Sequence, residues 1–526
     1  MAAKTGWLGR LLVPSFSDVF FAAVVMWLFM AGSGGWSFLL LDGDCGWHIK
    51  TGELVLQNGD VPRTDPYSFT KQGEQWFAWE WLADVAFALV HRAMGLKGVV
   101  LLAAVLIGAF ATVLLRQVLA AGSNLFIGLL GTLLAVGAST IHHLARPHLF
   151  TLVLLPCSLW LIQADRERPS HRVWILVPIT AVWCNLHGGF VALLACLGLA
   201  VVGSAGEGIA GAPEAWKRCR RYLLLIVACG AASLANPYGY QLHVHIAEYL
   251  RAGWIRELVQ EFQSPDFRSE SLFQFEMVLF GGLAAAAWLA AKKRYVEVLW
   301  VLFWAHSALG SVRHVPLFAA VAIPIVCREL SRVWRRWLEG AATGTSLASL
   351  RALERAQTGA FLRTSMWPAG FVLIVASLGF GMTWPKDFPE AKFPARSVAA
   401  YGGLLRRSRV LTSDQWADYL IYRGYPEQRV FLDGRSDFFG ERLVREYAAV
   451  TAGRYDWQKI LERHGIDVIL APAGWPLATL LKGHSEWQLL RDDGQAVLFQ
   501  RTTTETGVPL IKVGVEAERV SEDRIQ

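Results

Sequence analysis

Long apolar runs recur along the first 384 residues and alternate with short polar segments. A run of about 20 apolar residues is long enough to cross the hydrocarbon core of a bilayer as a helix. The pattern predicts a polytopic α-helical membrane domain over residues 1–384, with about eleven transmembrane helices. The predicted spans, several of them short, are residues 17–41, 97–116, 125–141, 147–164, 173–186, 188–204, 222–235, 272–290, 295–310, 314–331 and 367–384.

Charged residues between the runs predict the orientation. Lys and Arg gather in alternate loops, and the positive-inside rule places such loops in the cytoplasm. The N-terminus is then inside, and everything after Pro385 is outside. The basic residues that set this topology lie around Lys4 and Arg10, at Arg116, in 165–172, in 217–221, in 292–294 and in 328–363.

One apolar segment, Trp81–Met94, needs a separate interpretation. If it crossed the membrane, every later loop would change sides and the basic clusters would lie outside. Its short length and its charged residues, Asp84, His91 and Arg92, favour an amphipathic helix on the outer surface. The first outer loop therefore covers residues 42–96.

The pattern changes near Arg409, where short strands begin to alternate with amphipathic helices. Strands are predicted at RVLTS, RVFLD and DVILAP, followed by a hairpin that turns at Asp493-Gly494. We expect a small extracytoplasmic α/β domain over residues 385–502 and a polar tail over 503–526. The turn with Asp433, Arg435 and Asp437 fits ligand binding or ordinary turn chemistry.

Composition supports the membrane assignment and removes one class of partner. Charged residues make up 18% of the chain and hydrophobic residues 54%, and mean hydropathy is +0.35. Soluble domains usually carry about 25% charged residues. The net charge of +7 comes from short clusters and forms no continuous basic stripe, so no nucleic-acid partner is expected. The seven cysteines include no CxxC pair.

Candidate chemistry gathers on the predicted outer face. Asp42 and Asp44 end the first span, where carboxylates are costly and usually functional. Taken singly, the His, Asn and Arg residues of the other outer turns fit helix caps or lipid contacts. Taken together they form a candidate substrate-binding set: His48, Glu80, His142, His143, Arg146, His148, Asn185, His187, Asn236, Arg313 and His314.

This residue set suits group transfer from a lipid phosphate. Arg and His hold a phosphate by charge-assisted hydrogen bonds, and a carboxylate can act as general base on an acceptor hydroxyl. A divalent cation, Mg²⁺ or Mn²⁺, bound by Asp42 and Asp44 would bridge the carboxylates and the phosphate. A Lys or Arg could replace that cation, so metal dependence stays open.

The layout resembles the GT-C glycosyltransferase superfamily, which includes protein O-mannosyltransferases and aminoarabinose transferases. The matching features are Asp42 and Asp44, the surface helix Trp81–Met94 and the outer domain after Pro385. The resemblance implies an inverting enzyme with a polyprenyl-phosphate-linked sugar donor and a glycan, lipid or protein acceptor. The strings WCNLHGGF, NPYGY and RHVPLF also resemble a bacterial membrane family related to this superfamily, which implies a bacterial inner membrane location with the C-terminal domain in the periplasm. The His-rich outer turns are not a general feature of the superfamily, so donor recognition stays open.

Two other functions remain as alternatives. The chain could be a non-catalytic structural or assembly subunit of a membrane or cell-envelope complex, with the C-terminal domain as docking surface. A transporter would show inverted repeats and charges near the bilayer midplane, and neither is evident.

Overall fold

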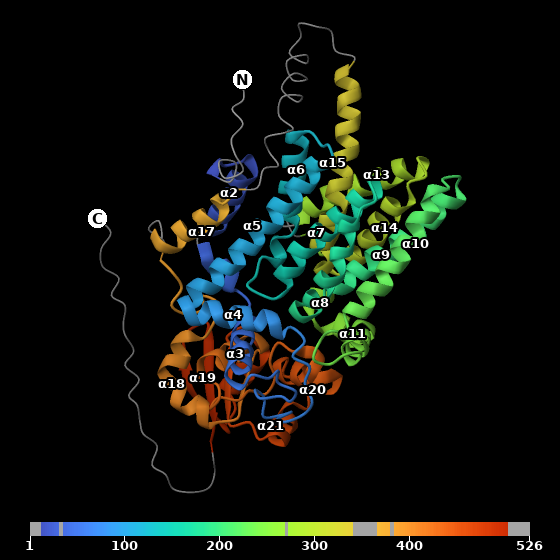
Figure 1. The fold of residues 1–526 in the computed structure, drawn as a ribbon. Coiled ribbons are helices and arrows are strands. Elements are labelled where there is room, and N and C mark those ends of the chain that lie inside the picture. Colours follow the sequence, from blue (N-terminus) through green and yellow to red (C-terminus); the bar gives the residue numbers. More distant parts are fainter. Residues whose placement is uncertain (1–11, 31–34, 269–271, 340–364, 379–382, 503–526) are drawn as a thin grey trace.

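The computed structural model describes residues 12–30, 35–268, 272–339, 365–378 and 383–502. A helical bundle forms one end of the molecule, and a small α/β domain forms the other (Figure 1). The predicted tail 503–526 lies outside the described residues, as do parts of two predicted spans, 17–41 and 367–384.

A helix coincides with each of the eleven predicted spans. Within the described part of the chain, five helices are long and apolar enough to cross a membrane: α5, α7, α9, α13 and α15 with the preceding turn. The count of eleven spans and the orientation remain predictions. The helices are α2 (Phe16–Met30), α5 (Leu96–Ala120), α6 (Leu125–Ala138), α7 (His148–Glu167), α8 (Leu176–Leu186), α9 (Phe190–Ile209), α10 (Glu214–Ala232), α13 (Phe273–Ala291), α14 (Tyr295–Gly310), α15 (Val315–Glu339) and α17 (Trp367–Leu378).

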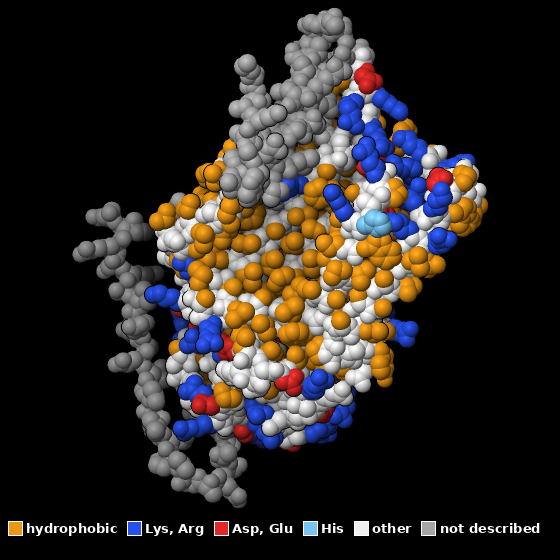
Figure 2. Space-filling view, in the orientation of Figure 1, with side chains coloured by type: hydrophobic (Ala, Val, Ile, Leu, Met, Phe, Trp, Pro, Cys, Tyr) orange, Lys and Arg blue, Asp and Glu red, His pale blue; other side chains and the backbone are white. Residues whose placement is uncertain are grey.

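The outside of the bundle is hydrophobic. Figure 2 shows apolar side chains covering the middle of the visible face, with charged side chains gathered at the upper right and along the bottom. Large apolar side chains such as Phe126, Leu130, Val202 and Val227 are more than half exposed. A surface that faced water would rarely carry so wide an apolar zone. The bundle is therefore that of an integral membrane protein.

Among the described residues, basic residues of the clusters 165–172, 217–221 and 292–294 lie together with Arg328, whereas Lys4, Arg10 and residues 340–363 lie outside the described residues. Arg166, Glu207, Glu297 and Arg328 link α7, α9, α14 and α15 by ion pairs at the end of the bundle away from the α/β domain. The predicted outer turns lie at the opposite end. The one-faced arrangement of unusual polar residues is therefore present in the fold.

Two helices of the first outer loop join the bundle to the α/β domain. The first is α3 (Asp44–Asn58), and the second, α4 (Trp81–Met94), has the predicted bounds. They pack against each other, and α4 also packs on α5. Figure 1 shows both where the bundle meets the α/β domain. The outer end also carries α11 (Gln241–Arg251), α12 (Gly253–Leu258) and the 3₁₀ turns η1 (Gly35–Leu40), η2 (Thr140–His142), η4 (Gln260–Phe262) and η6 (Val312–His314), while η3 (His171–Ile175) precedes α8.

A mixed four-stranded sheet organises the α/β domain, in the order β1-β2-β4-β3. The β1–β2 pair is parallel, with Leu411 opposite Ile469, and the β2–β4 and β3–β4 pairs are antiparallel. The parallel pair and the hairpin confirm the predicted partly parallel sheet. The elements are α18 (Ala395–Arg407), β1 (Val410–Thr412), α19 (Asp414–Gly424), α20 (Ser436–Thr451), α21 (Trp457–His464), β2 (Val468–Pro472), α22 (Pro476–Lys482), β3 (Trp487–Asp492) and β4 (Ala496–Arg501).

The prediction of a strand at RVFLD is wrong. Val430 forms only isolated bridges, one to Val410 and one to Ser68 of the first outer loop. Its backbone N–H donates to the Tyr67 carbonyl, and its own carbonyl accepts from Phe69. The segment thus joins the outer loop to the edge of the sheet, a partnership that local alternation cannot reveal.

Close backbone packing holds α3 against α19. A Cβ at Gly46 would lie 2.7 Å from the Asp418 carbonyl oxygen, and one at Gly43 would lie 2.2 Å from that of Gln415. Glycine is therefore required at both positions for this contact. The glycines of the DGDCG segment thus set how near the α/β domain approaches the membrane domain.

Substituting Gly46 tests this contact. We expect Gly46→Ala to destabilise the protein by about 1–3 kcal/mol, because the new methyl group forces the two helices apart. The measurements are the unfolding temperature in detergent and protease sensitivity between α18 and α19. Gly230→Ala, in α10 with no atom near the added Cβ, is the control and should change neither. Equal behaviour of both variants would contradict close packing at Gly46.

Candidate active site

A cavity of about 370 Å³ lies where the bundle meets the α/β domain. Its walls come from α3, the segment before α4, the first turns of α7 and α9, the outer ends of α14 and α15, and the turn at Gly434. Each predicted outer turn except the one at Asn236 contributes to these walls. Segments distant in sequence therefore meet at a single site.

Arg146 holds three carboxylates together at the cavity. Its guanidinium lies 2.7 Å from Asp42 Oδ2, 2.7 Å from Asp44 Oδ2 and 2.6 Å from Glu261 Oε1. The loop that carries Arg146 is held by a hydrogen bond from the Ala145 N–H to the Leu39 carbonyl, 2.8 Å long. Because Leu39 shortly precedes Asp42, this bond sets the distance between the arginine and the acid pair.

Only one acid of the predicted pair faces the cavity. Asp44 lines it, whereas Asp42 lies behind Arg146 and accepts a 3.0 Å hydrogen bond from the Asp44 N–H. Burial raises the pKa of Asp44 to about 7, reinforced by the charge of Asp42 and opposed by that of Arg146. Asp44 can therefore gain and lose a proton near neutral pH.

The α/β domain completes the surroundings of Asp44. A Cβ on Gly434 would lie 2.1 Å from Asp44 Oδ1 and 2.9 Å from Asp418 Oδ2, so both carboxyl groups border this glycine. Burial, and then the charge of Asp44, raise the pKa of Asp418 well above its usual range. The two buried carboxyl groups therefore favour a state in which they share a proton rather than both being ionised.

A second polar group lines the cavity around Glu80. The proton of His187 is on Nε2, since Nδ1 accepts from the Gly189 N–H at 2.9 Å. That Nε2 lies 3.4 Å from one oxygen of Glu80, and His48 Nε2 lies 3.8 Å from the other. Burial raises the pKa of Glu80 to about 8 despite the charge of Arg146.

Asp84 orients His48 from behind. Its Oδ1 lies 2.6 Å from His48 Nδ1. Burial, and then the charge of Glu80, raise the pKa of Asp84 well above its usual range, while burial and the charge of Arg146 lower that of His48. The short contact between Asp84 Oδ1 and Nδ1 fixes the orientation of the imidazole, so that Nε2 faces Glu80.

The remaining predicted residues divide into two groups. His142, His148, Arg313 and His314 line the cavity, and Arg313 donates to the Tyr249 hydroxyl at 3.1 Å. Three others do not line it. Asn185 accepts from the Trp81 indole and so anchors the start of α4, Asn236 bonds its own turn, and His143 lies buried against Trp27.

Two residues with large roles were not predicted for the site. Asp418 lies mid-helix between the buried residues Ala417 and Tyr419, and an acid at that position was the available signal. Glu261 lies in the short turn η4, where its sequence neighbours gave no signal of a site. The turn that contains Asp433 fitted either ligand binding or ordinary turn chemistry from sequence. Its residues Arg435 and Asp437 line the cavity, so the turn belongs to the site.

The predicted cation site at Asp42 and Asp44 does not fit this arrangement. Arg146 already contacts both carboxylates at 2.7 Å and occupies the position between them that a bridging ion would take. Among the described residues, no three His, Cys, Asp or Glu side chains are grouped as metal ligands.

No protein-family model and no curated protein matches the sequence. Solved structures do match. The archaeal oligosaccharyltransferase AglB from Archaeoglobus fulgidus, in complex with an inhibitory peptide and a dolichol-phosphate, is 12% identical, with 94% of this chain and 74% of that chain covered and a TM-score of 0.54. The same organism's oligosaccharyltransferase, tethered to an acceptor peptide with the NVT sequon, is 13% identical, with 87% and 68% covered and a TM-score of 0.55.

ArnT from Cupriavidus metallidurans, bound to undecaprenyl phosphate, is 14% identical, with 93% of this chain and 99% of that chain covered. Its TM-score of 0.43 is too low to indicate a common fold by itself. The two oligosaccharyltransferase structures, each with a TM-score above 0.5, are sufficient to assign the fold. This chain has the fold of these archaeal oligosaccharyltransferases. The resemblance predicted from sequence is confirmed at that level.

Removing Arg146 tests its role as the shared counter-charge. We expect Arg146→Gln to destabilise the protein by about 3–5 kcal/mol, because the buried Asp42 and Asp44 and the partly exposed Glu261 lose their shared cation. Arg146 lowers the pKa of both Asp44 and Glu261. Both groups would therefore titrate at higher pH in the variant, and the loss of stability relative to wild type should grow from pH 5 to pH 8.

The measurement is the unfolding temperature in detergent across that pH range. Arg396→Gln removes an exposed arginine that pairs with Glu390 and should leave the profile unchanged. A destabilisation of Arg146→Gln that does not depend on pH would contradict a shared counter-charge.

Proposed function

We propose that this protein is a membrane glycosyltransferase that moves a sugar from a polyprenyl phosphate donor to an extracytoplasmic acceptor. Asp44 is the general base. The observation that carries this assignment is that Asp44 alone of the acid pair faces the cavity, with a pKa of about 7 set by burial. A base with a pKa near the working pH is the most effective.

The cavity has a polar part and an apolar part that fit such a donor. Arg313 and His187 present cationic or donor groups to a phosphate. Toward the lipid, the walls become apolar on α7, α9, α14 and α15, as suits a polyprenyl chain. This part is lined by Leu152, Val191, Ala195, Phe303 and Leu317. The dolichol-phosphate bound by the similarly folded AglB supports this class of ligand.

The reaction follows from this placement. Asp44 takes the proton of the acceptor hydroxyl as its oxygen attacks the anomeric carbon, and the bond from that carbon to the phosphate oxygen breaks. The polyprenyl phosphate leaves with the electron pair, opposite to the attacking oxygen, so the configuration inverts. Glu80, with a pKa of about 8, holds a proton near neutral pH that can be shared with the leaving phosphate.

Arg146 supplies at the acid pair the positive charge that a bound divalent cation would otherwise supply. It neutralises Asp42 and Glu261 and lowers the pKa of Asp44 into the neutral range. We therefore assign no step to Mg²⁺ or Mn²⁺. The predicted setting is the bacterial inner membrane with the α/β domain in the periplasm, and the acceptor is a glycan, a lipid or a protein.

Asp44→Asn tests the base directly. We expect turnover to fall about 10²–10⁴-fold, because the amide cannot accept the proton. The assay follows release of undecaprenyl phosphate in proteoliposomes, from a panel of undecaprenyl-phosphate sugars and with membrane extract as acceptor source. Asp60→Asn, at an exposed acid of the same loop, is the control and should retain wild-type turnover. Full turnover of folded Asp44→Asn, or stable co-purification of partners without turnover by wild type, would favour the assembly-subunit alternative.

The pH dependence of turnover gives a second test. Because the base must be ionised, the rate should rise as pH increases through about 7, where Asp44 loses its proton. It should fall above about 8, where Glu80 loses its proton. In Glu80→Gln, which retains a neutral donor, the fall should disappear and the rise should remain. A flat profile between pH 6 and 9 would contradict both roles.

A further inference from the structure

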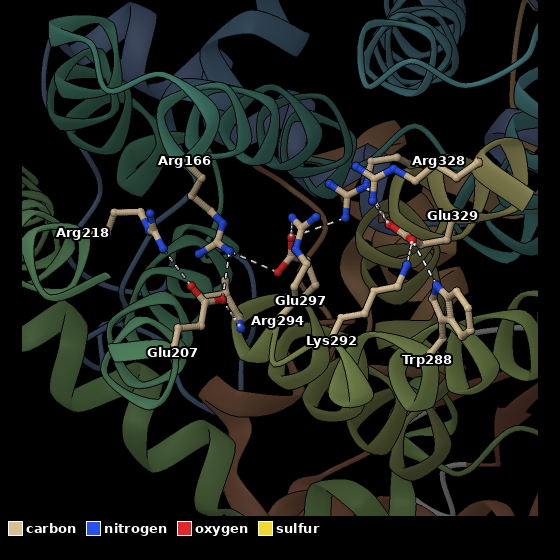
Figure 3. Close-up of polar contacts among 11 residues, drawn as sticks. Arg166, Glu207, Arg218, Trp288, Lys292, Arg294, Glu297, Arg328 and Glu329 are labelled. Carbon is tan, nitrogen blue, oxygen red and sulfur yellow. Dashed lines mark hydrogen bonds and ion pairs between the residues drawn. The ribbon is translucent and has the colours of Figure 1, made fainter. Parts of the chain in front are cut away.

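A charged network lies at the opposite end of the bundle from the candidate active site, between the ends of α7, α9, α14 and α15 (Figure 3). Arg166 Nη2 lies 3.2 Å from Glu207 Oε1 and 3.1 Å from Glu297 Oε2. Arg218 Nη2 lies 3.2 Å from the other oxygen of Glu207, and Arg328 Nη2 lies 3.4 Å from Glu297. The network therefore joins five helices, α10 included.

Positive charge exceeds negative charge in this network. Three carboxylates, Glu207, Glu297 and Glu329, accept all of the ion pairs, and Glu167 nearby adds a fourth negative charge. Their counterparts are seven cations: Arg166, Arg218, Lys292, Lys293, Arg294, Arg328 and Arg332. Because the excess cations lie close together and repel one another, a bound anion would stabilise them.

Part of this network surrounds a cavity of about 290 Å³. Its lining includes Arg166, Arg218, Lys293 and Arg294. Arg166 is only 9% exposed, yet its Nη1 has no hydrogen-bond partner, and neither has Nε of Arg218. Buried guanidinium nitrogens normally have partners, so two unpaired donors beside one cavity point to a missing acceptor.

The turn from α13 to α14 places two adjacent basic residues, Lys293 and Arg294, on the cavity wall. Lys293 has a positive φ of 58°. Its N–H donates to the Ala290 carbonyl and the N–H of Arg294 donates to the Leu289 carbonyl, each at 3.0 Å, so this conformation ends α13 as a Schellman motif.

We propose that this cavity binds a phosphate group, carried by an acidic phospholipid of the adjacent leaflet or free in solution. Two guanidinium groups with unused N–H donors match phosphate oxygens in charge and geometry. Basic pockets between membrane helices on the cytoplasmic side recognise acidic headgroups in this way. The site lies at the other end of the bundle from Arg146 and Arg313, so it does not depend on the proposed glycosyl transfer.

Native mass spectrometry of the full chain, released from nanodiscs of phosphatidylcholine with phosphatidylglycerol, tests the lipid source. The phosphate source is tested by the unfolding temperature in neutral detergent, with inorganic phosphate compared with chloride at equal ionic strength. We expect wild type to retain phosphatidylglycerol or to be stabilised by phosphate. The first result identifies a headgroup site, and the second identifies a site open to free phosphate.

Arg218→Gln removes one of the two unpaired donors at a partly exposed position, and Arg166→Gln removes the other. Each substitution should weaken phosphatidylglycerol retention, or the affinity for inorganic phosphate, roughly fivefold, because one basic residue beside the anionic group is lost. Lys217→Gln removes an equal charge from the neighbouring exposed position and should bind as wild type does. Arg313→Gln, at the far end, should also retain binding.

The proposal would be overturned if all four variants retained phosphatidylglycerol and were stabilised by phosphate as wild type is. It would also be overturned if wild type neither retained the lipid nor was stabilised by phosphate. The network would then be a structural link between helices. Loss of binding in Arg313→Gln alone would do the same, because it would place the phosphate in the candidate active site.

Discussion

The arrangement of the outer end of this protein depends on the ion pairs made by the guanidinium of Arg146. Asp42 and Asp44 come from one segment and Glu261 from another, and without a cation their closely spaced charges would repel one another. The arginine joins the end of the first membrane helix, the loop before α7 and the turn before α13. The same interaction holds the pKa of Asp44 near neutrality, so the contact that stabilises the fold also prepares its chemistry.

The α/β domain is part of the site. Arg435 is almost fully buried, 2.6 Å from Asp433 and 2.7 Å from Asp65 of the first outer loop, and its guanidinium carbon lies 4.5 Å from the centre of the Trp76 ring. A buried pair of this kind costs desolvation and is retained where it sets a unique geometry. It places Gly434 against Asp44, so the α/β domain closes one side of the cavity.

Much of this arrangement could be predicted from sequence, because span length and loop charge are local properties that determine where a helix lies. Interpreting Trp81–Met94 as a surface helix brought Asp44, Arg146 and Arg313 to one face, as the structure does. Other features depend on contacts between distant segments. Asp418 reaches the site only because Gly46 lets α19 approach α3, and the choice between Asp42 and Asp44 depends on which one Arg146 shields.

A structure of the full chain in nanodiscs with undecaprenyl phosphate, determined by electron cryomicroscopy, tests the central claim most directly. The account predicts density for the phosphate between Arg313 and the His148–His187 pair, with the chain running between α7, α9, α14 and α15 and the Asp44 side chain facing the phosphate. Density for the lipid only on the outer surface of the bundle, with this cavity filled by solvent, would contradict it.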